Sequence, residues 1–181
     1  NLAERDALTQ QYNRWGGQQL LDEFMRSEST GSIIMLDIDH FKKINDSYGH
    51  TAGDLILIQF AELMQQVFRS SDYLIRWGGE EFLVVMRHMN RDNASLYAER
   101  LRLTVEQHAF AISDSQSINM TCSIGFACYS IIEGDTPTLS WNQVIDVADS
   151  CLYAAKKSQR NAWIGVDSIA PEILFNDLIA N

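Results

Sequence analysis

The sequence has few cysteines, few prolines and no long apolar run, and each absence excludes a class of protein. Three cysteines, Cys122, Cys128 and Cys151, lie within apolar patterns and not at metal-ligand spacing. We therefore expect reduced core thiols in a cytosolic chain, which excludes a disulfide-stabilised secreted scaffold. Only two prolines occur, and no low-complexity segment or linker divides the chain. No apolar run reaches the roughly 18 residues that span a bilayer, and no secretory signal is present.

Basic residues are also scarce, with 14 Lys and Arg against 24 Asp and Glu and a net charge of −10. Nucleic acids and anionic membranes bind clustered cations, so this balance excludes a general surface for either. It is compatible with an anionic small ligand held by a few local cations and a divalent metal. With 181 residues and 46% apolar content, the chain is large enough to bury a core as one globular domain.

The chain opens within a helical pattern and has no initiator Met. We therefore expect residues 1–181 to be one domain from a longer protein. Residues 1–14 would be an opening segment that joins a missing N-terminal sensory region, and residues 169–181 a C-terminal tail. The domain is expected to be cytoplasmic, and the sequence leaves open whether the longer protein is anchored in a membrane.

Apolar periodicity predicts the order of elements. Helices are expected at 15–26, 39–48, 55–67, 93–108 and 144–157. Strands are expected at 32–36, 73–76, 81–86, 118–127 and 162–166, with loops at 49–54 and 134–140. This order contains a βαββαβ core, which predicts an α/β (α+β) fold of the ferredoxin-like or palm type. Its sheet would be mainly antiparallel, with helices on one face.

The segment Arg76-Trp77-Gly78-Gly79-Glu80-Glu81-Phe82 joins two predicted strands. Adjacent glycines predict a tight turn with positive φ angles, and without side chains they let a metal and a bulky anion approach the backbone. In a βαββαβ sheet, Asp37 at the end of the first strand would come close to Glu80 and Glu81. Such carboxylates suit Mg²⁺ with nucleotide phosphates, although a solvated turn is the usual explanation of an isolated Gly-Gly-Glu-Glu.

Further polar residues suit a nucleotide. Lys42 and Lys43, and the C-terminal group Lys156, Lys157 and Arg160, could contact triphosphate oxygens, or they could simply be solvated helix faces. Asn45 and Asp54 could read a guanine edge, because a carboxylate accepts hydrogen bonds from the N1–H and N2 amino groups that adenine lacks. Each could equally be a capping or turn residue.

Several ordered motifs resemble those of GGDEF domains, the diguanylate cyclases, in the variant with Glu at the third position. The resemblance covers nearly the whole chain. Besides the hairpin, it is carried by Asp6-Ala7-Leu8-Thr9 with Asn13-Arg14, Asp37-Ile38-Asp39-His40-Phe41-Lys42, Asn45-Asp46, Gly49-His50 through Gly53-Asp54, Thr121-Cys122-Ser123-Ile124-Gly125, Tyr153-Ala154-Ala155-Lys156 and Arg160-Asn161. Two positions depart from the family pattern, since Gln10 and Gln159 stand where glycine is usual.

The resemblance implies condensation of two GTP into cyclic di-GMP with release of two pyrophosphates. It implies Mg²⁺, or Mn²⁺ in its place, as cofactor. Each domain would hold one GTP, so a homodimer is part of the mechanism. The metals would be bound by Asp37, the Ile38 carbonyl and Glu80, and Glu81 would be either a further ligand or the acceptor of the 3′-hydroxyl proton.

The resemblance also assigns the remaining site residues. Guanine would be read by Asn45 and Asp54. Phosphates would be contacted by Lys42, Lys156, Arg160 and the backbone near His40 and Phe41, beside Gly78 and Gly79. Arg69 and Asp72 match an RxxD inhibitory motif that binds the product, with Arg100 as a weak candidate for a second arginine. Outside the family, an Arg and an Asp at this spacing are usually a local salt bridge.

Two other functions compete with an active cyclase. One is a catalytically silent domain that binds GTP or cyclic di-GMP and regulates a partner, which the complete set of site residues disfavours. The other is a cyclase that uses ATP or a single substrate molecule, which Asn45 and Asp54 disfavour.

Overall fold

The computed structural model describes residues 2–27, 30–88, 93–130 and 140–167. The helices are η1 (Leu2–Glu4, a 3-10 helix), α1 (Arg14–Ser27), α2 (Phe41–Tyr48), α3 (His50–Val67), α4 (Asn93–Gln107) and α5 (Trp141–Ser158). The strands are β1 (Thr30–Ile38), β2 (Tyr73–Arg76), β3 (Glu81–Arg87), β4 (Phe110–Ala111), β5 (Ser117–Ile118), β6 (Cys122–Ser130) and β7 (Trp163–Val166). The predicted tail at 169–181, and the predicted 134–140 loop up to residue 139, lie outside the described residues.

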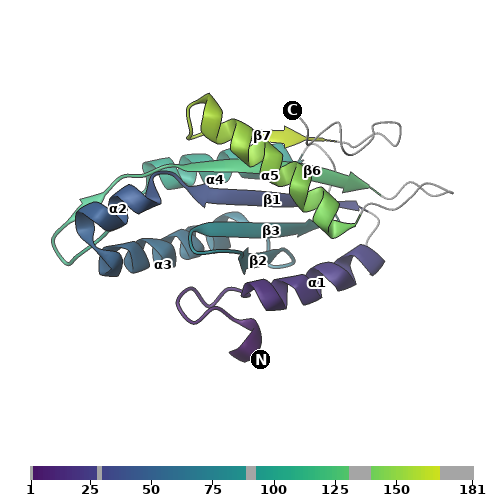
Figure 1. Cartoon of the computed structure of the whole chain (residues 1–181), viewed down its shortest axis with the longest axis horizontal. Helices are drawn as coiled ribbons and strands as arrows, with labels where there is room; N and C mark the ends of the chain where they lie inside the picture. The colour runs from purple at the N-terminus through teal and green to yellow at the C-terminus, as the bar shows by residue number, and fades with distance from the viewer. Residues whose placement is uncertain (1, 28–29, 89–92, 131–139, 168–181) are drawn as a thin grey trace.

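Five strands form a sheet in the order β2-β3-β1-β6-β7 (Figure 1). Neighbours are antiparallel except for β6 and β7, which are parallel. β1 lies in the middle and is buried along all its length after Thr30. Apart from Ser32 and Asp37, its buried side chains are apolar on both faces rather than alternating. The predicted α/β class with a mainly antiparallel sheet is confirmed.

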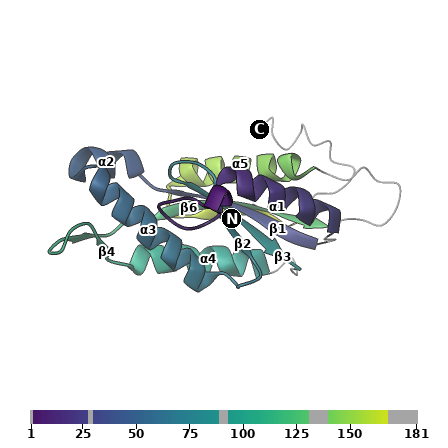
Figure 2. The same ribbon diagram turned by 90° about the horizontal axis from the view of Figure 1, so that it is seen from below.

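Helices cover both faces of this sheet, as Figure 2 shows. α3 and α4 pack on one face, around Ile34, Phe60 and Phe82. α1 and α5 pack on the other face, around Leu21 and Ile33. The expected one-sided arrangement therefore holds only for α3 and α4 of the βαββαβ core. The position of α5 in the second layer follows from chain connection, because a crossover between the parallel strands β6 and β7 must pass over a face of the sheet.

Three predicted boundaries were wrong. The 49–54 segment is a loop only at Gly49, whose φ of 90° separates α2 from α3. His40 adopts a left-handed conformation with φ 57°, so α2 begins at Phe41 rather than at residue 39. The strand predicted at 118–127 is two strands, because Ile118 belongs to β5, which pairs with β4 in a separate two-stranded sheet, and β6 of the main sheet begins at Cys122.

Gly125 of β6 sets how closely α5 docks. A Cβ atom at Gly125 would lie 2.1 Å from the Leu152 nitrogen and 2.2 Å from the Ala148 oxygen. Real Cβ atoms do not approach backbone so closely, so only glycine fits. This contact brings the C-terminal end of α5 over the end of β1 that carries Asp37.

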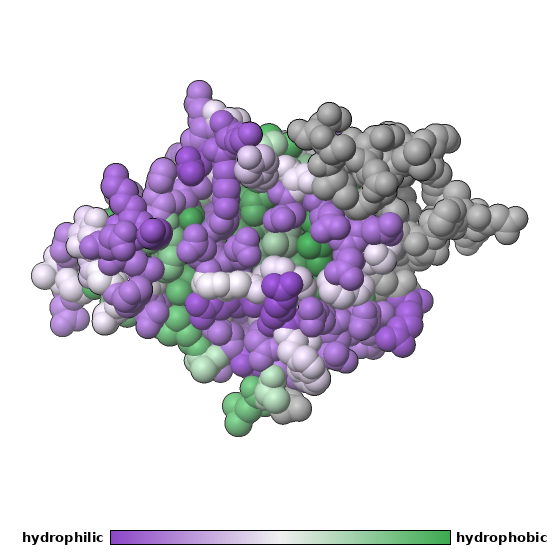
Figure 3. Space-filling model, viewed as in Figure 1, coloured by the Kyte–Doolittle hydropathy of each residue, from purple (hydrophilic) through white to green (hydrophobic). Residues whose placement is uncertain are grey.

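The cysteines and the surface agree with the composition. Cys122, Cys128 and Cys151 are buried and reduced, as predicted, and burial raises the pKa of Cys151 to about 11, which makes a reactive thiolate unfavourable. The face shown in Figure 3 is mostly hydrophilic, with small separate apolar areas. Within the described ranges, no helix has the length and apolar character needed to cross a membrane.

Candidate active site

Asp37 lies at the end of the central strand β1. It pairs in register with Glu81 of β3 on one side and with Ser123 of β6 on the other. Its side chain is buried, and Oδ2 forms an ion pair with Lys156 of α5. The other carboxylate oxygen, Oδ1, has no hydrogen-bond partner among the described residues. A buried acceptor without a donor is costly, so this oxygen is suited to receive a ligand.

The β2–β3 turn carries Glu80 and Glu81 to the same end of the sheet. The N–H groups of Trp77 and Gly78 donate to the Glu81 carbonyl at 2.9 and 3.1 Å, which closes the turn. Neither Gly78 nor Gly79 has a positive φ, so the predicted primed turn was wrong. Gly79 instead faces open space, because a Cβ atom there would meet nothing within 4 Å. The turn therefore leaves an open approach beside the carboxylates.

The three carboxylates are costly to keep charged. Burial raises the pKa of Asp37, and the ion pair with Lys156 offsets only part of that effect. The pKa values of Glu80 and Glu81 are raised first by burial and then by the negative charge of Asp37. Raised pKa values on neighbouring carboxylates are typical of functional sites, where a cation or a proton relieves the repulsion.

The carboxylate oxygens of this site are the type of ligand that a divalent metal such as Mg²⁺ binds. Within the described ranges, no three His, Cys, Asp or Glu side chains converge on a preformed metal site. Mg²⁺ does not need such a cage, because it normally takes one or two carboxylates and completes its shell with phosphate oxygens and water. The unpartnered Asp37 oxygen, together with the two glutamates across the β1–β3 pair, supplies hard oxygen ligands of that type.

The segment after β1 forms the rim of the site. Phe41 is buried in the core and anchors the start of α2, while Lys42 is exposed. His40, the N-cap residue, has a left-handed conformation and its side chain makes no cap hydrogen bond to the first N–H groups of α2. Uncapped N–H groups at a helix start attract anions. This end of the helix can therefore accept phosphate oxygens.

Asn45 of α2 and Asp54 of α3 lie on either side of the Gly49 break. The Asn45 side-chain oxygen is buried and has no partner among the described residues. It lies against Gly53, where a Cβ atom would be only 1.9 Å away. The two helices can therefore pack with Asn45 between them only because residue 53 lacks a side chain. Asp54, the next residue, is exposed to solvent.

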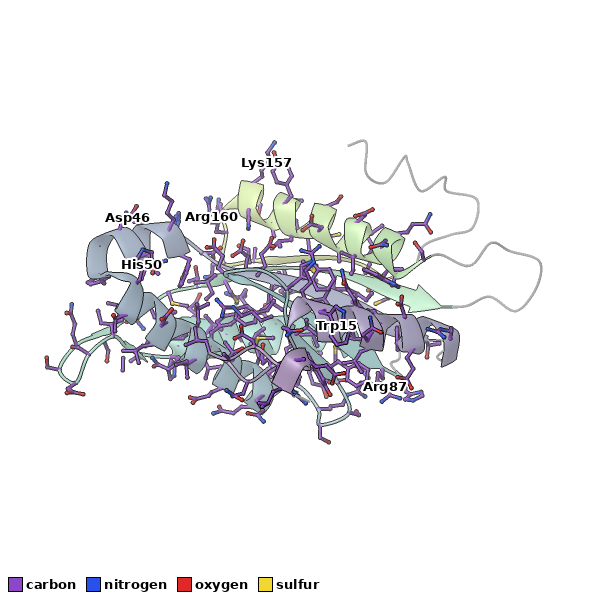
Figure 4. All side chains as sticks on the ribbon, turned by 60° about the horizontal axis from the view of Figure 1, so that its bottom comes forward. Trp15, Asp46, His50, Arg87, Lys157 and Arg160 are labelled. Carbon is purple, nitrogen blue, oxygen red and sulfur yellow. The ribbon has the colours of Figure 1, made fainter. Side chains whose placement is uncertain are left out.

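Two cations lie at the end of α5. Lys156 is half-buried and forms an ion pair with Asp37, whereas Arg160 is exposed. Figure 4 shows Arg160 at the end of the molecule that also carries Asp46 and His50, where α2 meets α3. Gln159 has an extended φ of 179°, which any residue adopts, and the left-handed bend falls on Arg160 and Asn161 instead. The absence of glycine at position 159 therefore causes no strain there.

A comparison with protein families agrees with this geometry. The family model described as "Diguanylate cyclase, GGDEF domain" matches residues 3–162. The chain belongs to the GGDEF family.

Curated proteins contain similar GGDEF domains. The chain is 39% identical over 134 residues to diguanylate cyclase A of Treponema denticola, covering 74% of this chain and 34% of that protein. It is 38% identical over 169 residues to response regulator PleD of Caulobacter vibrioides, covering 91% and 36%. This GGDEF chain therefore spans about a third of the length of these relatives.

Solved GGDEF structures have the same fold. The GGDEF domain of DgcB from Caulobacter crescentus, in complex with c-di-GMP, matches with a TM-score of 0.82 and 30% identity, over 92% of this chain and 94% of that chain. Diguanylate cyclase SiaD from Pseudomonas aeruginosa, in complex with its activator SiaC, matches with a TM-score of 0.81 and 32% identity, over 91% and 64%. The family and fold class predicted from the sequence are confirmed.

The RxxD motif of this GGDEF domain forms a compact local pair. The Asp72 side chain is fully buried and accepts hydrogen bonds from the Arg69 guanidinium at 2.8 Å and from the Arg69 backbone N–H at 2.8 Å. Arg69 also donates to the Arg87 carbonyl at 2.6 Å. Arg100 of α4 is exposed and lies over the Tyr97 ring, which stacks on Phe68, the residue before Arg69. The three predicted residues thus lie on neighbouring elements.

Two residues near the site were not predicted from the sequence. Arg76 donates to the Gly79 carbonyl at 2.8 Å and to both carboxylate oxygens of Asp6 at 3.1 and 3.2 Å, so it ties the opening segment to the GGDEF turn. Burial raises the Asp6 pKa, but hydrogen bonds from Thr9 and Arg76 outweigh it and the net pKa is lowered. The second is Asp39, which belongs to the motif Asp37-Ile38-Asp39-His40-Phe41-Lys42 but had no role assigned to it.

Proposed function

We propose that this chain is a diguanylate cyclase domain that condenses two GTP into cyclic di-GMP and releases two pyrophosphates. The observation that carries the proposal is the register of Asp37 against Glu81, which brings carboxylates from two distant segments beside Lys156 and an open glycine turn. The similarity to proteins named diguanylate cyclases supports the same reaction.

The metal-binding residues would be Asp37, Glu80 and the Ile38 carbonyl. Mg²⁺, or Mn²⁺ in its place, would stabilise the leaving pyrophosphate and make the attacking 3′-hydroxyl more acidic. Glu81 would either complete the metal site or accept the hydroxyl proton. Burial and the Asp37 charge raise the Glu81 pKa, which makes this carboxylate a better proton acceptor than an ordinary one.

Binding and orientation of GTP would be divided between two regions. Asn45 and Asp54 would read guanine through its N–H donors, which adenine does not present in the same way. The triphosphate would lie beside Gly78 and Gly79 and be contacted by Lys42, Lys156, Arg160 and the N–H groups near His40 and Phe41. These cations would offset charge that the metal does not reach.

The reaction also requires a second copy of the domain. One site of this kind holds one GTP, so two sites must face each other in a homodimer for each 3′-hydroxyl to attack the other nucleotide. We further propose that residues 1–181 form one domain in the cytoplasm, where GTP is available, and that residues 1–14 connect it to an upstream sensory region. Arg69 and Asp72, with Arg100, would bind the product and inhibit the enzyme.

Incubation of the purified protein with GTP and Mg²⁺, followed by mass spectrometry of the products, tests the proposal. We expect cyclic di-GMP and pyrophosphate, no cyclic product from ATP, and no reaction after chelation of the metal. Asp37→Asn should reduce the rate at least a hundredfold, because it removes a ligand charge without changing shape. Binding of GTP without any turnover would identify a silent regulatory domain instead.

A further inference from the structure

Asp39 is a buried carboxylate that the proposed mechanism does not use. Its relative exposure is 4%. Three neutral groups donate to it: the Thr121 hydroxyl at 2.7 Å, the Ser123 hydroxyl at 2.7 Å and the Asn161 backbone N–H at 2.9 Å. A buried charge held by three strong hydrogen bonds is an expensive arrangement, so it marks a position where geometry must be fixed.

The Asn161 bond fixes an unusual turn. Arg160 and Asn161 both have left-handed backbones, with φ of 59° and 44°. Such conformations are strained for residues other than glycine, and they persist only where the surroundings hold them. Here the Arg160 N–H donates to the Ala155 carbonyl at 3.2 Å, and the Ala162 carbonyl accepts from Ile124 at 2.9 Å. The Asp39 carboxylate holds the middle of the turn.

The Asn161 side chain is braced from a second direction. Its carbonyl oxygen accepts a hydrogen bond from Arg102 of α4 at 3.1 Å, and its amide donates to Glu106. Arg102 in turn pairs with Glu99. The turn is thus connected to the end of β1 through its backbone and to α4 through a side chain.

Of the residues proposed to contact phosphates, one lies in this turn and another lies just before it. Arg160 is in the turn, and Lys156 lies one helical turn earlier, on Asp37. We propose that Asp39 is a positioning residue, which orients the Arg160–Asn161 turn so that Arg160 and Lys156 meet the triphosphate without further ordering. This inference rests on the proposed function, and it concerns the phosphates and not the base, because Asn45 and Asp54 belong to different elements.

Loss of the Asp39 carboxylate should therefore weaken binding of the triphosphate but not of the guanine base. In Asp39→Asn one acceptor oxygen becomes an NH2 group and the negative charge is lost, so the Asn161 N–H keeps at most a weaker bond to a neutral amide oxygen in place of its charge-assisted bond. We expect the affinity for α,β-methylene-GTP, measured calorimetrically with Mg²⁺, to fall about tenfold, since ordering and orientation then cost free energy on binding. The affinity for guanosine monophosphate, which lacks two of the phosphates, should change less than twofold.

Position 161 offers a matched pair that separates backbone geometry from side-chain contacts. Asn161→Gly and Asn161→Ala both remove the amide, but only glycine accepts a positive φ without strain. We expect Asn161→Gly to keep most of the triphosphate affinity and Asn161→Ala to lose it as Asp39→Asn does. This pair decides the question even if Asp39→Asn fails to fold. Ser32→Ala, a buried polar change near the other end of β1, controls for general loss of stability.

Two results would overturn the positioning role. One is an equal loss of affinity for the triphosphate and the monophosphate in Asp39→Asn, and the other is identical triphosphate affinity in the two Asn161 variants. Failure of the wild-type protein to bind either guanine nucleotide would instead refute the proposed function, so the two failures are distinguishable.

Discussion

Asp37 of β1 lies directly opposite Glu81 of β3, at the end of an antiparallel register that starts with Gly31 opposite Arg87. Antiparallel neighbours have Cβ atoms about 4.5–5.5 Å apart, so two carboxylates at this position repel one another unless a cation or proton intervenes. The structure supplies Lys156 to Asp37. The glutamate is left with a raised pKa, and this cost in stability is the basis of the first prediction.

Glu81→Gln should raise the melting temperature of the metal-free protein by a few degrees near neutral pH, and it should reduce the stabilisation gained from Mg²⁺. Burial and the Asp37 charge raise the Glu81 pKa above its ordinary value of 4.5, so the folded state binds a proton more readily than the unfolded state. The wild type therefore loses stability as pH rises from 4.5 through the raised pKa. Thermal melts across this range should show the two curves converging towards acid pH, and a gap independent of pH would contradict the assignment.

Gly53→Ala should abolish guanine nucleotide binding and destabilise the fold by about 1–3 kcal/mol. The added Cβ would lie 1.9 Å from the Asn45 side-chain oxygen, and α2 or Asn45 must move to relieve the overlap. Gly79→Ala is the matched control for stability, since a Cβ atom there meets nothing within 4 Å. Urea denaturation measures the first effect and nucleotide titration the second. Retained affinity in Gly53→Ala would remove Asn45 from the guanine site.

Arg69→Ala should raise the concentration of cyclic di-GMP needed for inhibition at least tenfold. It should also lower stability by roughly 1.5–3 kcal/mol, because the buried Asp72 carboxylate loses a charged hydrogen-bond donor. Arg100→Ala removes an exposed guanidinium, so it should weaken inhibition without this loss of stability. Initial rates at increasing product concentration, beside thermal melts, separate the effects. Unchanged inhibition in Arg69→Ala would leave the pair as a structural salt bridge.

Local patterns predicted the part of this architecture that depends on neighbours in sequence. Short apolar runs located β1, β2 and β3, and the βαββαβ order then placed Asp37 beside Glu81. The same reasoning mistook the glycines of the hairpin for a primed turn. The loop has four residues between β2 and β3, and the Glu81 carbonyl closes it by accepting two N–H groups. Two adjacent glycines therefore do not by themselves reveal a turn type.

Two other sets of contacts between distant segments were not predicted. The ion pair of Lys156 with Asp37 joins residues 119 positions apart, and it exists because Gly125 lets α5 lie close against β6. The network of Asp39 with Thr121, Ser123 and Asn161 likewise joins three segments. The apolar periodicity of the sequence does not indicate such long-range contacts, since each residue alone is compatible with a helix cap or a solvated surface.

Lys156→Met should tighten Mg²⁺ or Mn²⁺ binding in the absence of nucleotide, by several-fold, while it weakens the affinity for α,β-methylene-GTP. Without nucleotide, the Lys156 ammonium neutralises Asp37 and must be displaced or shared when a metal binds. Methionine keeps the length and apolar stem but not the charge, so the buried Asp37 is left unpaired. The free energy of unfolding of the metal-free variant should therefore fall by about 2–3 kcal/mol, and metal addition should restore more of it than it adds to the wild type.

Lys157→Met is the matched control, because Lys157 is exposed and lies over the Tyr153 ring instead. Calorimetry with the metal alone measures the first effect. Metal affinity that falls in Lys156→Met would mean that the lysine supports the metal site rather than competes with it.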